Sequence, residues 1–276
     1  FTAGDRARPG VVANQKVIEL PYPDLAAFLE DGERGRQAAE KLVAAGLATA
    51  THPLSAVRLL APLPRPPKFI CIGLNYRDHA IESGMAIPST PTVFSKYSNA
   101  VIGPGEAIRL PKVSQEVDYE AELAFVIGRR GRDVAPVRWK DFVFGYTIVN
   151  DVSARDFQRA TSQWTIGKTF DTFAPMGPEL VSADEIEDPH NLRISCEVNG
   201  RVLQDSSTSQ LIFRIPELVS YLSQVMTLEP GDVVSTGTPP GVGFARKPPI
   251  FLQPGDEVVV KVEGLGELRN PVVSSQ

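Results

Sequence analysis

Three acidic residues alternate with other residues in the segment Val-Asp-Tyr-Glu-Ala-Glu at residues 117–122, which continues as an apolar run to Gly128. The alternation predicts a β-strand with the side chains of Asp118, Glu120 and Glu122 on one face, each about 7 Å from the next. Carboxylates this close repel one another, and burial strengthens the repulsion. A hard divalent cation would remove that cost, and all-oxygen ligands favour Mg²⁺, Mn²⁺ or Ca²⁺ over zinc. The alternative is a solvated acidic face that lysines of a neighbouring strand neutralise.

A further carboxylate stands at the end of another apolar run. Asp151 follows residues 142–149, which read as a strand, and precedes a segment that could begin a helix behind Ser153. By itself Asp151 suits an N-cap or an Asx-turn, which is the more common role at such a position. Its combination with the acidic segment makes metal ligation a competing interpretation.

His79 and Glu82 follow a third predicted strand, residues 69–73. Residues three apart are neighbours on a helix. A glutamate beside a histidine orients the ring and raises its basicity, which suits a general base. The alternative is a structural histidine near the start of a helix.

Two segments offer groups that could bind an anionic ligand. Lys168 stands beside Gly167, where the backbone can approach a ligand closely. Residues 235–243, which include Thr238, form a Gly/Pro-rich loop with N–H and hydroxyl donors suited to an oxyanion or a carboxylate. This loop is not a P-loop, because the Gly-Lys-Ser/Thr ending is missing.

The composition restricts the class of protein. The chain has 276 residues, 42% hydrophobic and 22% charged, with a formal net charge of −5, so we expect neither nucleic acid nor membrane as a partner. No apolar run is long enough to span a bilayer and no signal peptide is visible, so we expect a cytoplasmic protein. A start at Phe1 is compatible with processing or trimming. Cys71 and Cys196 lie in apolar segments and are predicted to be buried, reduced thiols.

The elements that must position these groups are mainly strands. Residues 1–65 form a first unit with a predicted hairpin and two helices, and the proline-rich residues 61–68 read as a linker. Residues 66–276 form the main domain, in which strands outnumber helices and do not alternate with them regularly. This argues against a TIM barrel or a doubly wound sheet and predicts a β-rich α+β fold.

Five segments, taken in order, resemble the fumarylacetoacetate hydrolase superfamily. They are Gly-Leu-Asn-Tyr-Arg-Asp-His (73–79), Asp-Tyr-Glu-Ala-Glu-Leu (118–123), Asn-Asp-Val-Ser-Ala-Arg-Asp (150–156), Gly-Lys-Thr-Phe-Asp (167–171) and Thr-Gly-Thr-Pro-Pro-Gly-Val-Gly (236–243). The resemblance covers residues 69–273 and is specific as an ordered set. Residues 114–118, 167–173 and 246–252 bring it nearest to the branch called fumarylacetoacetate hydrolase domain-containing protein 2, in which a small N-terminal domain often occurs.

The resemblance implies a fold and a metal centre. The family fold is a mixed β-roll with few helices, here preceded by a small N-terminal α+β domain, and its members are usually homodimers. One Mg²⁺ or Mn²⁺ per chain, with Ca²⁺ as a substitute, would be held by Glu120, Glu122 and Asp151. Asp118 precedes the two usual glutamates, and its role stays open.

The resemblance also implies a substrate site for a 2-oxo acid. His79 and Glu82 would form the base dyad on a lid that orders when substrate binds. The substrate would be contacted by Arg155, Gln158, Lys168 and Thr238.

The implied activity is metal-dependent hydrolysis of a C–C bond in an acylpyruvate, through an enolate that the metal and Lys168 stabilise. His79, steered by Glu82, would activate the attacking water. The same enolate serves oxaloacetate tautomerisation or decarboxylation and hydroxymuconate-type isomerisation, so these remain alternatives. A non-catalytic metal-binding protein is a more remote one, because such a protein would not need the dyad or Lys168.

Overall fold

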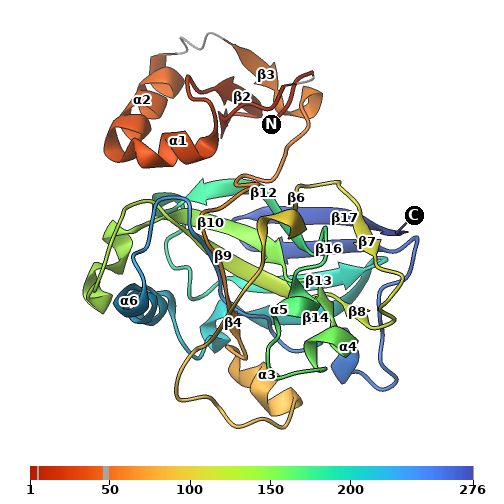
Figure 1. The fold of residues 1–276 in the computed structure, drawn as a ribbon. Coiled ribbons are helices and arrows are strands. Elements are labelled where there is room, and N and C mark those ends of the chain that lie inside the picture. Colours follow the sequence, from red (N-terminus) through yellow and green to blue (C-terminus); the bar gives the residue numbers. More distant parts are fainter. Residues whose placement is uncertain (5, 46–49, 276) are drawn as a thin grey trace.

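The computed structural model describes residues 1–4, 6–45 and 50–275, in which a small N-terminal part lies beside a larger β-rich body (Figure 1). The N-terminal part is an antiparallel sheet in the order β1-β2-β3 with two helices. Its elements are β1 (Gly10–Ala13), β2 (Lys16–Glu19), α1 (Leu25–Glu30), α2 (Gly32–Ala45) and β3 (Thr51–Pro53). Residues 61–68 follow without helix or strand, as their prolines predict. The domain boundary between residues 65 and 66 stays a prediction.

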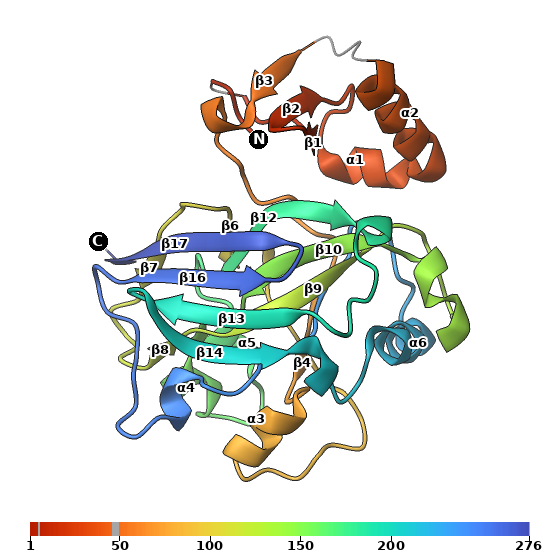
Figure 2. The same cartoon turned by 180° about the vertical axis from the view of Figure 1, so that it is seen from behind.

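Two large sheets form the body and pack face to face (Figures 1 and 2). The first has the order β5-β4-β15-β9-β10-β12-β6 and the second β14-β13-β16-β17-β7. The strands of the first are β4 (Phe69–Gly73), β5 (Thr92–Ser95), β6 (Val101–Ile102), β9 (Ala121–Ile127), β10 (Val143–Asn150), β12 (Ala174–Ser182) and β15 (Val233–Ser235). Those of the second are β7 (Ile108–Leu110), β13 (Arg193–Val198), β14 (Arg201–Ser207), β16 (Glu257–Val262) and β17 (Gly266–Ser274). Both sheets mix parallel and antiparallel pairs, which confirms the predicted β-rich mixed roll.

The helices of the body are few and mostly short. They are α3 (Arg77–Glu82), α4 (Arg155–Gln158), α5 (Thr165–Lys168) and α6 (Ile215–Val225). In Figure 1, α3 and α4 lie together below the sheets, whereas α6 lies to one side. Within the residues that the structure describes, no helix is long and apolar enough to cross a bilayer.

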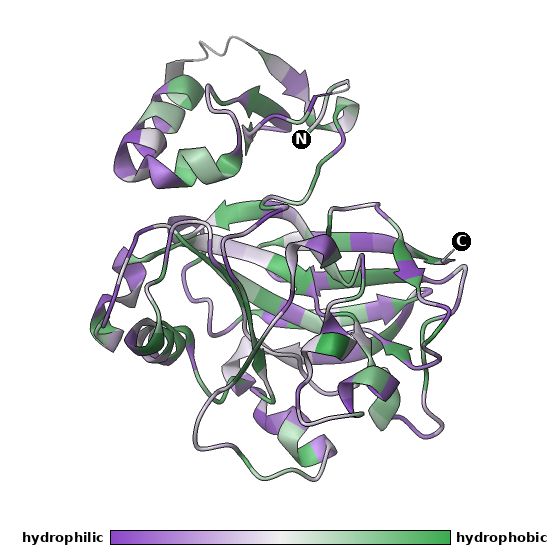
Figure 3. Ribbon diagram, viewed as in Figure 1, coloured by the Kyte–Doolittle hydropathy of each residue, from purple (hydrophilic) through white to green (hydrophobic). Residues whose placement is uncertain are grey.

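The strand β9 lies at the centre of the body, between β15 and β10, and all seven of its residues are buried. Successive side chains of a strand point to opposite faces, so its run Leu-Ala-Phe-Val-Ile suits a strand that is covered on both sides. Hydrophobic residues are accordingly frequent along the central strands (Figure 3). The burial of the charged residue Glu122 in β9 is therefore exceptional and requires a chemical explanation.

The two cysteines, Cys71 and Cys196, are buried and free, as predicted.

The acidic segment is not one strand, contrary to the prediction from its alternation. Pairing stops after Asp118 in β8 (Val117–Asp118) and resumes at Ala121 in β9. β8 pairs only with β11 (Ser153–Ala154), whereas β9 pairs with β10 and β15, so Asp118 belongs to a different sheet from Glu122. Ser153 is likewise a strand residue, and the helix predicted behind it is only α4, without a side-chain cap.

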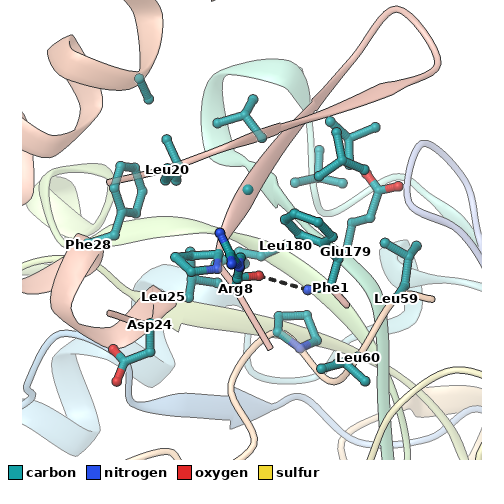
Figure 4. A pocket seen from close by; sticks show the side chains of 18 of the residues that line it. Phe1, Arg8, Leu20, Asp24, Leu25, Phe28, Leu59, Leu60, Glu179 and Leu180 are labelled. Atoms are coloured by element: carbon teal, nitrogen blue, oxygen red, sulfur yellow. Dashed lines mark hydrogen bonds between the residues drawn. The ribbon is translucent and has the colours of Figure 1, made fainter. Parts of the chain in front are cut away.

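A cavity of about 840 Å³ lies between the N-terminal part and the body. Leu20, Leu25 and Phe28 line it from the N-terminal part, and Glu179 and Leu180 line it from β12 (Figure 4). Its lining comes from residues 1–64, 101–106, 144 and 178–185. The cavity therefore lies outside all the segments that carry the predicted chemistry.

Candidate active site

Glu120, Glu122 and Asp151 form a buried carboxylate cluster in which one oxygen of each lies within 4.8 Å of the others. Their exposed fractions are 5%, 2% and 0%, which excludes the solvated acidic face. The register of β9 with β10 builds the cluster, because Glu122 lies opposite Val149 and the end of β10 brings Asp151 beside Glu120. The Asp151 N–H donates to the Glu120 carbonyl at 2.9 Å. Asp151 is not a helix N-cap, since α4 begins four residues later.

The charges of this cluster are unevenly compensated. Burial raises the pKa of Glu122 well above its ordinary value, and the charges of Asp151 and Glu120 raise it further. Burial also raises the pKa of Glu120, but Arg155 and Lys168 outweigh burial and hold this pKa at about 2. The hydroxyl of Ser235 donates to Glu122 Oε2 at 2.5 Å, and the Gly237 N–H donates to the same oxygen at 3.0 Å. Among the residues that the structure describes, Glu122 thus has hydrogen-bond donors but no cationic side chain bonded to it.

Two buried lysines contact the cluster. Lys168 Nζ donates to Glu120 Oε2 at 2.5 Å and to Asp151 Oδ2 at 2.8 Å. Burial alone would lower the pKa of Lys168, but Asp151 and Glu120 outweigh it and raise the pKa. Lys96, directly after β5, donates to Asp151 Oδ1 at 2.6 Å and to the Val152 carbonyl at 3.1 Å. Sequence reasoning missed Lys96, although a lysine at the end of an apolar strand needs a partner when it is buried.

Gly167 allows α5 to lie directly against α4. A Cβ atom at this position would lie 2.4 Å from the Gln158 backbone nitrogen and 2.7 Å from the Ala154 carbonyl oxygen. Both are backbone atoms, which cannot move aside as the end of a flexible side chain can. The close contact sets the position of the next residue, Lys168.

We expect Gly167→Ala to lower the free energy of unfolding by about 1–3 kcal/mol, as overpacking of a filled site does, and to reduce turnover by displacing Lys168. Urea unfolding and steady-state kinetics measure the two effects. Ile166→Ala is the matched control, because it truncates a 62% exposed side chain of the same helix. Wild-type stability of Gly167→Ala would contradict the close contact between the two helices.

His79 and Glu82 meet on α3, as their spacing predicts, with His79 Nδ1 3.0 Å from Glu82 Oε2. The other oxygen, Glu82 Oε1, accepts the Gly241 N–H at 2.9 Å. Burial raises the pKa of Glu82, but the hydrogen bonds with His79 and Gly241 outweigh burial and lower it. Since Gly237 of the same loop donates to Glu122, residues 236–243 connect the dyad to the carboxylate cluster. With Nδ1 at Glu82, the ring nitrogen left for proton transfer is Nε2.

The remaining predicted residues differ in their distance from the cluster. Arg155 Nη2 lies 2.7 Å from Glu120 Oε1, and Arg155 Nη1 donates to Gln158 Oε1 at 2.8 Å. Thr238 lies in the loop of residues 236–243, and its hydroxyl accepts a hydrogen bond from Gln204 Nε2 at 2.8 Å. Arg155 and Lys168 therefore contact the cluster directly. Gln158 reaches it through Arg155, and Thr238 reaches it through the loop. Their contacts with a substrate stay predictions.

The donor set fits a divalent metal ion. All three members of the cluster offer hard carboxylate oxygens, the kind of ligand that Mg²⁺, Mn²⁺ and Ca²⁺ prefer. The raised pKa of Glu122 has burial and like charge as its causes, and a bound dication would compensate both.

The family model described as Fumarylacetoacetate (FAA) hydrolase C-terminal matches residues 68–273. The rat protein named "Oxaloacetate tautomerase Fahd2a, mitochondrial" is 50% identical over 250 residues, which cover 90% of this chain and 79% of the rat protein. This similarity confirms the branch that the motifs indicated. The rat protein is named as mitochondrial, so the expected cytoplasmic location of this chain stays a prediction, as does the homodimer.

Two solved structures extend the comparison. The 5-carboxymethyl-2-hydroxymuconate delta-isomerase from Mycobacterium smegmatis is 48% identical, with a TM-score of 0.74 and coverage of 83% of this chain and 87% of that one. The maleylpyruvate hydrolase from Sphingobium sp. SYK-6, in complex with manganese(II) ion and pyruvate, is 34% identical, with a TM-score of 0.83 and coverage of 99% and 98%. With the family match running from β4 into β17 and the fold shared with both enzymes, this chain is an enzyme of the fumarylacetoacetate hydrolase family.

Proposed function

We propose that the enzyme is an oxaloacetate keto–enol tautomerase that uses one Mg²⁺ or Mn²⁺ bound by Glu120, Glu122 and Asp151. The observation that carries the proposal is the shared loop of residues 236–243, which binds Glu82 of the dyad at Gly241 and Glu122 of the cluster at Gly237. This arrangement would join a proton-transfer group, His79, to a site at which a metal ion could chelate a 2-oxo acid. The name of the rat relative, an oxaloacetate tautomerase, supports the same reaction.

The reaction requires one proton to move between C3 and the C2 oxygen of oxaloacetate. A bound divalent ion would supply Lewis-acid polarisation of the 2-oxo group. Lys168 would add a positive charge next to the oxygen on which negative charge develops. His79 would accept the proton from C3 through Nε2 while Glu82 fixes the orientation of the ring.

Hydrolysis of an acylpyruvate is the second candidate, because the maleylpyruvate hydrolase with manganese and pyruvate shares the fold over almost the whole chain. Hydrolysis uses the same groups but also needs a water molecule placed for attack on the distal carbonyl. Tautomerisation needs only the proton-transfer group and the polarised 2-oxo group, and we therefore rank it first.

A substrate panel separates the two candidates. Enol and keto oxaloacetate, acylpyruvates and a hydroxymuconate-type diacid would each be followed with Mg²⁺, with Mn²⁺ and with a chelator. We expect the enol absorbance of oxaloacetate to relax rapidly without release of pyruvate, and the chelator to abolish this acceleration. Faster cleavage of an acylpyruvate than tautomerisation of oxaloacetate would replace the proposal by hydrolysis. Full turnover of metal-stripped enzyme would contradict the metal centre itself.

A further inference from the structure

Asp118 is fully buried and makes four hydrogen bonds, although it is not part of the carboxylate cluster. Its Oδ1 accepts the backbone N–H groups of Gly243 at 2.7 Å and Tyr119 at 2.9 Å. Its Oδ2 accepts Arg155 Nε at 2.9 Å and the Phe244 N–H at 3.1 Å. Four donors match the approximately four lone-pair sites of a carboxylate. Asp118 therefore has no lone pair left for a metal ion.

These bonds connect three segments that are distant in the sequence. Asp118 lies opposite Ser153 in the pairing of β8 with β11, which places it next to the start of α4 and thus next to Arg155. The turn Gly243–Ala245 is shaped around the same carboxylate, because a Cβ atom at Gly243 would lie 2.6 Å from Asp118 Oδ1. The ring of Phe244 covers the guanidinium of Arg155, with 4.4 Å from the guanidinium carbon to the ring centroid.

Arg155 transmits this arrangement to the cluster. Its planar guanidinium has a fixed fork of donors, so the hydrogen bond from Nε to Asp118 sets the direction of the other two nitrogens. Nη1 then faces Gln158 and Nη2 faces Glu120 at 2.7 Å. Without Asp118, Arg155 would keep its charge but lose the contact that orients it.

We propose that Asp118 is a positioning residue of the active site, which holds Arg155 and the Gly243–Phe244 turn so that Glu120 is presented for metal binding. This proposal rests on the proposed function in one respect, the metal site, and does not depend on which substrate the enzyme uses. Arg155, which contacts the proposed ligand Glu120, is the kind of partner whose replacement typically changes metal affinity or activity about 10–100-fold, and Asp118 acts through Arg155.

The test uses Asp118→Asn, which keeps the size of the side chain but presents an N–H₂ group to two of the four donors. We expect the Kd for Mn²⁺, measured by calorimetry on fully folded protein without substrate, to rise about 10–100-fold, with a fall in kcat/KM. Asp205→Asn is the matched control, because Asp205 is an exposed residue of β14 that accepts Arg193 Nε and Nη2 at 2.9 and 2.8 Å. The control should bind Mn²⁺ as the wild type does.

A purely structural role would lower the thermal midpoint of Asp118→Asn but leave the Mn²⁺ affinity of the folded protein unchanged, and that result would overturn the proposal. If Asp118→Asn does not fold, Arg155→Lys tests the same connection, because lysine keeps the charge and loses the fork. Wild-type Mn²⁺ affinity in folded Arg155→Lys would also overturn it. Mn²⁺ binding is measured without substrate. The test therefore stays valid even if the enzyme proves not to tautomerise oxaloacetate.

Discussion

Glu122→Gln should bind no measurable Mn²⁺, and its turnover should fall to the uncatalysed rate. The replacement keeps the volume of a side chain that is 2% exposed, but removes one of the three charges that would hold the dication. Without metal, the variant should be at least as stable as the metal-free wild type. Burial and the charges of Asp151 and Glu120 already raise the pKa of Glu122 and disfavour its ionised form. The variant thus separates loss of the metal from loss of the fold.

Calorimetry and thermal unfolding together measure this result. At 100 times its Kd, Mn²⁺ adds about 2.7 kcal/mol to the free energy of unfolding of a protein that binds it only when folded, and Glu122→Gln should show no such gain. Glu197→Gln is the matched control, since Glu197 pairs with Lys261 at 2.6 Å in the second sheet. Unchanged Mn²⁺ affinity in Glu122→Gln would exclude Glu122 as a ligand.

His79→Ala should lower kcat about 10²- to 10⁴-fold, the range in which a general base contributes. Its affinity for Mn²⁺ and for oxalate should stay at the wild-type level, because the proposed ligands Glu120, Glu122 and Asp151 belong to other segments. Rapid tautomerisation assays with enol oxaloacetate measure kcat, and calorimetry measures both affinities. Glu82→Gln should give a smaller fall in kcat, since it removes the orienting charge but leaves the ring.

His52→Ala is the matched control, because His52 lies in β3 of the N-terminal part. Loss of Mn²⁺ binding in His79→Ala, with the three carboxylates intact, would make His79 a ligand and would refute its role as a base. An unchanged kcat for tautomerisation would show that a group other than His79 accepts the C3 proton, and would likewise refute the role of His79 as the base.

Two pairs of groups in the site, Glu120 with Glu122 and His79 with Glu82, gave local signals in the sequence. Glu120 and Glu122 are two residues apart and flank the start of a central strand, and His79 and Glu82 are three apart on a short helix. Lys96 was missed because its partner Asp151 is 55 residues away, and the four bonds of Asp118 include one that spans 125 residues. Such contacts depend on the register of paired strands, which the local pattern of a sequence does not encode.

Three strands of the structure, β12, β14 and β17, lack the sequence pattern typical of a strand. β12 contains Pro175 and Pro178, which are unusual in a central strand. Neither proline has a paired strand on both sides. Pro175 pairs with Ile102 of β6, and the register of β12 with β10 begins only at Met176. Pro178 lies beyond the two residues that pair with β6, where β10 is the neighbouring strand. β14 is an edge strand that pairs only with β13, and its polar residues show no clear alternation. In β17, Pro271 lies opposite Glu257 of β16, and a proline inside a strand is equally unusual.

The pairing of β9 with β10 restricts where insertions and deletions can accumulate as sequences of this kind diverge. From Gly145 to Asn150 the two strands pair without interruption, and one inserted residue there would shift Asp151 by about 3.3 Å and turn the following side chains to the opposite face. Residues 128–142 connect β9 to β10 and precede the irregular register between Val143 and Gly145. A change in the length of this connection would not shift the pairs from Gly145 to Asn150. We therefore expect insertions and deletions to be compatible with catalysis before the irregularity, in residues 128–142, and incompatible with it after the irregularity, in residues 145–150.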